Sequence, residues 1–195
     1  NLIRRGAARE SEIFDAQTQW IVEHKLSQNI SFALHEGDIT NLNTPTQWEN
    51  ASRSLHMLDG HVPYAIVPGN HDIGPNGRAG TRDTLLNEFF PVSGFESLPS
   101  FGGVFEEDRI DNSFHVFETG AGLWLVIALE FGPREEVVRW ASRIVATIKL
   151  TRHEDPAVLD GLRDRLAAGP ARFAALKHLR SGGHEVTVLW AGWRA

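Results

Sequence analysis

Two short polar strings, each placed directly after an apolar run, constrain the fold of this chain more than any other feature. The apolar runs are residues 30–34 and 62–67, and the strings that follow them are Gly37-Asp38-Ile39-Thr40-Asn41 and Gly69-Asn70-His71-Asp72. Each run is typical of a buried strand, and each leading glycine allows a sharp turn close to a ligand. Both strings are therefore predicted at the carboxyl ends of strands, where open α/β sheets bind their ligands.

The side chains of these strings have a shared chemistry. Asp38, Asn70 and His71 offer a carboxylate, an amide oxygen and an imidazole, which suit a divalent metal ion and a proton donor. Each also has an ordinary alternative when it is taken singly. Asp38 can be a turn or helix-cap carboxylate, Asn70 a left-handed turn residue and His71 a surface imidazole. Asn41 can be a plain loop amide, and Asp72 can cap a following turn.

Taken together, the two strings resemble metal-site motifs of the calcineurin-like metallophosphoesterases. That family carries GD-x-x-D/N and GNH-D/E in this order, each behind a strand. The resemblance covers residues 12–146, and the flanking strings 14–22 and 129–136 are similar to one bacterial branch of the family. Residues 147–195 form a divergent tail that we cannot align with it.

The resemblance implies a role for four residues. Asp38 would bridge two divalent metal ions, and Asn70 would give an oxygen to the second ion. His71 would be the general acid, and Asn41 would orient His71. The ions would be Mn, Fe, Zn or a related metal, and the reaction would be hydrolysis of phosphomonoesters or phosphodiesters by a two-metal mechanism. The substrate would be a small-molecule phosphoester.

The chain departs from the family pattern at both ends. The stretch before Glu10 contains no Asp and no apolar strand, so the family's first metal motif is missing. Near the other end, His184 only faintly resembles the late GH-x-H motif because Val186 replaces its second histidine, and His153 is a poorer match still. Three interpretations stay open: an active hydrolase, an inactive binding module of the same fold, and a truncated fragment.

The order of helices and strands predicts the fold class. Helical patterns begin at Ser11 or Asp15, at Thr44-Pro45, at Thr81 and at Pro133, and strand patterns cover 30–34, 62–67, 112–118, 123–129 and, in the tail, 185–190. An Ala/Leu/Arg-rich helix is expected over residues 155–180. This order indicates two packed sheets flanked by helices. With the resemblance, it predicts an α/β fold: a four-layer α/β/β/α sandwich of two mixed sheets, incomplete at both ends.

Composition narrows the class of partner. The 195 residues suit a single domain, 1–195, and 25 acidic against 19 basic side chains argue against dedicated nucleic-acid binding. The absence of cysteine excludes disulfides and thiolate metal sites but leaves the compartment open. No apolar stretch is long enough for a membrane span, so we expect a soluble chain, either cytoplasmic or secreted with its signal peptide absent. The oligomeric state is left open.

Overall fold

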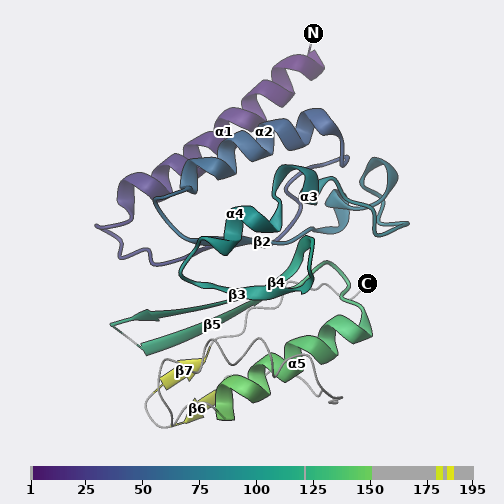
Figure 1. Cartoon of the computed structure of the whole chain (residues 1–195). Helices are drawn as coiled ribbons and strands as arrows, with labels where there is room; N and C mark the ends of the chain where they lie inside the picture. Colours follow the sequence, from purple (N-terminus) through teal and green to yellow (C-terminus); the bar gives the residue numbers. More distant parts are fainter. Residues whose placement is uncertain (1, 121, 151–178, 182–183, 187–195) are drawn as a thin grey trace.

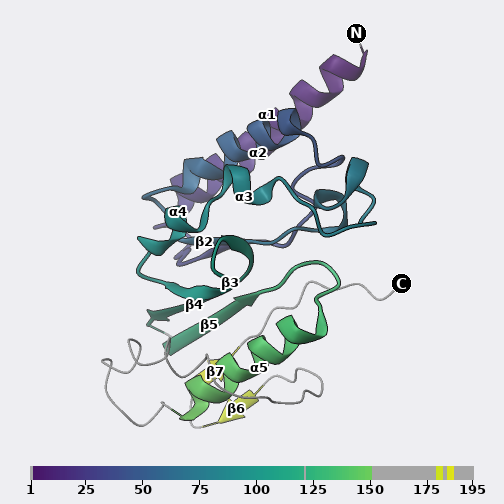
Figure 2. The same cartoon turned by 45° about the vertical axis from the view of Figure 1, so that its right-hand side comes forward.

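The molecule contains two sheets with helices packed on them. The computed structural model describes residues 2–120, 122–150, 179–181 and 184–186. Helices α1 (Leu2–His24) and α2 (Pro45–Leu55) lie side by side over the strands β1 (Ala33–His35) and β2 (Tyr64–Ile66). A second sheet follows below these strands, and helix α5 (Glu135–Leu150) covers its far face (Figures 1 and 2). The chain is therefore an α/β protein.

The strands β1 and β2 form a parallel pair. Ala33 is paired with Tyr64, and His35 with Ile66, so both strands end at the same edge. The predicted run 62–67 contains β2, whereas β1 begins inside the run 30–34 and extends one residue beyond it to His35; each strand is only three residues long. Parallel pairing requires a crossover between the strands. Helix α2 supplies this crossover, with Pro45 in its first turn as predicted, and a short 3-10 helix (His56–Leu58) ends it.

Helix α1 begins earlier than the sequence pattern predicted. Ser11 and Asp15 were expected to cap it, but both lie inside the helix. Asp15 instead accepts hydrogen bonds from Arg53, at 3.2 Å, and from Ser54, both on α2. Its carboxylate therefore joins the two helices, a tertiary role that a search for helix caps could not detect.

The second sheet is antiparallel, with the strand order β3 (Phe101–Glu106), β4 (Arg109–Thr119) and β5 (Gly122–Ala128). The strands predicted over 112–118 and 123–129 are confirmed as β4 and β5, except that β5 ends at Ala128, and the two pair with each other; β3 was not predicted. Helix α5 packs its apolar side on this sheet, where Phe114, Ile127 and Trp140 share one core cluster. A smaller cluster joins the two sheets to each other.

Two short helices and two strands complete the described residues. The helix predicted to begin at Thr81 forms only as α3 (Leu86–Phe89), which ends before Pro91, and a further short helix, α4 (Val92–Glu96), follows Pro91. In the tail, β6 (Leu179–Ser181) pairs with β7 (His184–Val186), and β7 contacts β5. The helix expected over 155–180 and the strand expected over 185–190 fall mostly outside the described residues.

Candidate functional site

The two polar strings meet at one edge of the parallel pair, as the sequence predicted. Because β1 and β2 run in the same direction, the turns that follow them leave the sheet side by side. Gly37 has φ +95° and Asp38 has φ +53°, so the first turn uses the left-handed region at two successive residues. This backbone carries the Asp38 side chain towards the second turn.

The two turns touch at van der Waals distance. A Cβ atom placed on Gly69 would lie 2.3 Å from Asp38 Oδ1, and one placed on Gly37 would lie 2.6 Å from the Gly69 Cα. The backbone N–H of His71 donates to Asp38 Oδ1 at 3.1 Å. Asp38 and the short 3-10 helix Asn70–Asp72 are therefore in direct contact, and both glycines are required by the close approach.

Asp72 is the centre of a hydrogen-bond network that joins the turns. Its side chain is fully buried and accepts four hydrogen bonds. Three come from the first turn: the N–H of Ile39 at 2.9 Å, and the N–H and hydroxyl of Thr40 at 2.6 and 2.9 Å. The fourth comes from the N–H of Gly69 at 2.8 Å. Burial raises the pKa of this carboxyl, and the four donors act in the opposite direction.

The predicted contact between Asn41 and His71 is present, but through a different group. His71 Nδ1 lies 3.0 Å from the backbone carbonyl oxygen of Asn41, whereas the sequence reasoning assigned this role to the side-chain amide. A carbonyl oxygen only accepts, so Nδ1 carries the hydrogen in this contact and Nε2 is the free ring nitrogen. The backbone therefore fixes the orientation and the tautomer of this imidazole.

A glycine supports this contact from behind. Gly77 ends the short 3-10 helix Pro75–Gly77 with φ +62°. A Cβ atom there would lie 2.6 Å from the carbonyl oxygens of both Asn41 and His71. The loop after the second turn is thus packed directly against the carbonyl oxygens of Asn41 and His71.

The segment after β5 borders the second turn, and sequence reasoning gave it no role. The N–H of Phe131 donates to the Pro68 carbonyl at 2.9 Å, and Arg82 donates to the carbonyls of Phe131 and Gly132. Glu130 is buried and accepts a hydrogen bond from Arg134 Nε at 2.8 Å. The string 129–136 was noticed only as part of the resemblance. The charged residues of this string, which follow a buried strand, were the sequence feature that could have indicated its place beside the site.

The oxygen atoms of Asp38 and Asn70 are of a type that binds divalent ions. Asp38 is exposed and Asn70 half-buried, so a carboxylate and an amide oxygen are available at the joined turns. Oxygen donors with remaining positions filled by water suit ions such as Mg and Mn. Within the described residues, however, no three His, Cys, Asp or Glu side chains gather where they could hold a metal. The described part of the chain therefore does not by itself build a two-metal centre.

Neither His115 nor His184 belongs to the two joined turns. His153 lies outside the described residues, and His184 belongs to β7, which lies beside β5. His115 on β4 is fully buried with its ring against Phe32 and Phe101. Burial lowers its pKa to about 4.

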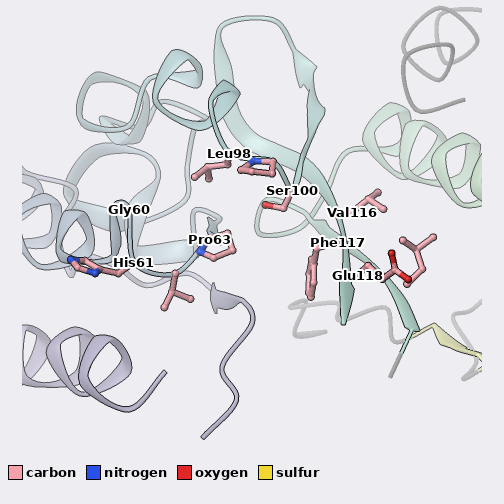
Figure 3. A pocket seen from close by; sticks show the side chains of 11 residues that line it. Gly60, His61, Pro63, Leu98, Ser100, Val116, Phe117 and Glu118 are labelled. Carbon is pink, nitrogen blue, oxygen red and sulfur yellow. The ribbon is translucent and has the colours of Figure 1, made fainter. Parts of the chain in front are cut away.

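The pocket in Figure 3 lies at the opposite end of β2 from the joined turns. It has a volume of about 590 Å³ and is lined mainly by apolar groups, among them Pro63, Leu98 and Phe117. Ser100 also lines it, and the Ser100 hydroxyl is buried without a partner. None of the four predicted site residues lines this pocket. It is therefore separate from the candidate site.

No helix among the described residues has both the length and the apolar character needed to cross a bilayer.

Comparisons with known proteins agree with the geometry. A sequence profile of the family described as calcineurin-like phosphoesterase matches residues 11–157, well over half of the chain. YvnB of Bacillus subtilis (strain 168), an uncharacterized protein, is 28% identical over 145 residues, which are 73% of this chain and 10% of that protein. The chain thus spans about a tenth of the length of the curated relative it matches.

Proposed function

This chain belongs to the calcineurin-like phosphoesterase family, and from that premise we propose that it is a metal-dependent hydrolase of phosphoric esters. The observation that carries the proposal is the contact between the two motif turns at one sheet edge, where His71 N–H donates to Asp38. Phosphomonoesters and phosphodiesters of small molecules are the proposed substrates. We further propose that the layers form the four-layer α/β/β/α sandwich, with the tail 147–195 as part of one domain.

Four residues carry the proposed chemistry. Asp38 and Asn70 would hold the divalent ion, which would act as a Lewis acid on a phosphoryl oxygen when bound. His71 would protonate the leaving-group oxygen from Nε2 as an imidazolium, which carries a proton on both ring nitrogens, while the Asn41 carbonyl fixes Nδ1. Asn41 would act through its carbonyl as the orienting group. A second metal ion, and with it the two-metal mechanism, would require ligands beyond those that the described residues provide.

The inactive binding module remains the second candidate, and one observation favours it. Among the described residues no three His, Cys, Asp or Glu side chains are grouped where they could hold a metal ion, and metal affinity rises with the number of ligands. The alternative predicts a stable chain that binds metal weakly and has no turnover. One experiment that measures both metal binding and turnover therefore distinguishes the two candidates.

The experiment measures Mn²⁺ content and hydrolysis of p-nitrophenyl phosphate and bis(p-nitrophenyl) phosphate by the whole chain. We expect Mn²⁺-dependent hydrolysis that Asp38→Ala abolishes with loss of bound metal. His71→Ala should retain metal but lower turnover by about 10²–10⁴-fold, the usual range for a lost proton donor. Asp108→Ala, an exposed carboxylate in the β3–β4 turn, should match the wild type.

Turnover that is indifferent to Asp38→Ala would refute the proposed site. Absence of both Mn²⁺ binding and turnover in a folded wild-type chain would refute the hydrolase and support the binding module.

A further inference from the structure

Asp72 is the only carboxylate among the described residues that is hydrogen-bonded to backbone groups of both motif turns. It holds the N–H groups of Ile39 and Thr40 on one side and that of Gly69 on the other. We propose that Asp72 is a positioning residue, which sets the distance between the metal-binding turn and the turn that carries Asn70 and His71. This inference rests on the proposed function.

Each proposed site residue lies close in sequence to a backbone group that is hydrogen-bonded to Asp72. Ile39 follows Asp38 in the chain, and fixing its N–H fixes the left-handed turn at Asp38. Thr40 precedes Asn41, whose carbonyl oxygen meets His71 Nδ1. Gly69 precedes Asn70. Each proposed ligand and the proton donor is thus one or two residues from a backbone group held by Asp72.

The distance between the two turns is also limited in both directions. Gly37 and Gly69 are already in contact, so the turns cannot move closer, and the bonds to Asp72 prevent them from moving apart. The Asp72 carboxylate has acceptor oxygens on both sides, whereas an amide of the same size has one acceptor and one donor. In Asp72→Asn the N–H₂ group would replace either Oδ1, against the Thr40 N–H, or Oδ2, against the N–H groups of Ile39 and Gly69.

Asp72→Asn should therefore change the distance between the two motif turns while the fold stays nearly the same. Groups that orient metal ligands without touching the metal typically contribute about 10–100-fold to metal affinity. We therefore expect Asp72→Asn to weaken Mn²⁺ binding by about tenfold or more.

Asp111→Asn is the matched control. Asp111 is also a buried carboxylate, and it accepts hydrogen bonds from Arg109 at 2.6 Å and Asn87 at 3.2 Å. The same substitution there removes an acceptor from an equally buried place that contacts neither turn. If Asp72 acts only on global stability, the two variants should change Mn²⁺ affinity in proportion to their unfolding free energies.

The test measures Mn²⁺ affinity of the whole chain by calorimetry or EPR, together with urea unfolding. We expect Asp72→Asn to lose Mn²⁺ affinity and Asp111→Asn to keep it within about twofold, even where its stability falls as much. Thr40→Val, which removes one of the four donors to Asp72, should give a smaller loss in the same direction. Equal affinity in Asp72→Asn and the wild type, or equal losses in both Asn variants, would overturn the inference.

A metal-free readout separates this inference from the proposed function. Amide hydrogen exchange should show the N–H groups of Ile39, Thr40 and Gly69 losing protection together in Asp72→Asn and staying protected in Asp111→Asn. If the wild type binds no Mn²⁺, the hydrolase proposal fails, and this exchange pattern still decides the positioning role. Unchanged protection of all three N–H groups in Asp72→Asn would contradict it. Where Asp72→Asn does not fold, Thr40→Val provides the same comparison.

Discussion

At the scale of single residues, the backbone determines how the candidate site is built. The His71 imidazole is oriented by a carbonyl oxygen, and the two motif turns are joined through backbone N–H groups that Asp72 accepts. Gly77 lies against this arrangement with φ +62° and no room for a Cβ atom. Its replacement should therefore strain the site as well as the loop.

We predict that Gly77→Ala lowers the unfolding free energy by about 2–3 kcal/mol, of which about 1–2 kcal/mol is the cost of left-handed backbone for a residue with a Cβ. Two glycines separate the contributions. Gly60 has φ +70° and open space around its Cβ position, so Gly60→Ala should show the backbone cost alone. Gly80 also has open space and no such φ, so Gly80→Ala should be close to neutral. Urea unfolding checks the order, and Gly77→Ala equal to Gly60→Ala would contradict the clash.

At the scale of elements, Asn43 attaches the loop after β2 to helix α2. Its side-chain oxygen accepts from Trp48 Nε1 at 2.8 Å and from the Leu85 N–H at 3.3 Å. Its amide nitrogen donates to the carbonyls of Gly74 and Asp83, both at 3.2 Å. The loop that supports His71 is therefore held by the crossover helix, which the short strands alone could not achieve.

Asn43→Ala should lower the unfolding free energy by roughly 3 kcal/mol, because it leaves the indole N–H of the fully buried Trp48 without a partner and adds left-handed strain. Asn76→Ala is the control. Asn76 has a similar φ of +54°, is exposed, and should lose only about 1 kcal/mol. Denaturant unfolding followed by tryptophan fluorescence measures both, and equal losses would show that the side-chain bonds of Asn43 contribute nothing.

At the scale of the whole molecule, the two sheets and their helices are held by three apolar clusters. One lies under α1 and α2, one between the antiparallel sheet and α5, and a small one joins the sheets. His115 on β4 lies in this interior, where its ring meets Phe32 from the segment before β1 and Phe101 from β3. A buried imidazole with no acidic partner makes the packing of the layers sensitive to acid.

We predict that the chain loses stability as the pH falls from about 6.5 to about 4, because burial lowers the pKa of His115 to about 4 in the folded state. In this pH window His115 is protonated in the unfolded chain but not in the folded chain, so the unfolding free energy decreases as the pH is lowered. The loss from this group is about 3 kcal/mol over the window. Above pH 6.5 the group makes no pH-dependent contribution.

The comparison of wild type with His115→Phe isolates this effect, because the phenyl ring retains the aromatic contacts and does not titrate. Urea unfolding at a series of pH values should show a flatter acid limb for His115→Phe, while His61→Gln, at an exposed position, should follow the wild type. Parallel acid limbs in all three chains would refute the assignment. Using the difference between variants also removes the contributions of Asp72 and Asp111, whose raised pKa values act with the opposite sign.

The sequence by itself determined the family, the α/β class and the four residues that come together at the sheet edge. It could do so because strand periodicity and glycine turns are local, and parallel strands with a crossover place both turns at one edge. Only the tertiary structure decided that Asn41 acts through its carbonyl, that Asp72 joins the turns and that Asp15 pairs with α2. These outcomes depend on which groups of distant segments come into contact. Every residue has a backbone carbonyl oxygen, so the residue type does not show which of them will accept a hydrogen bond from another segment.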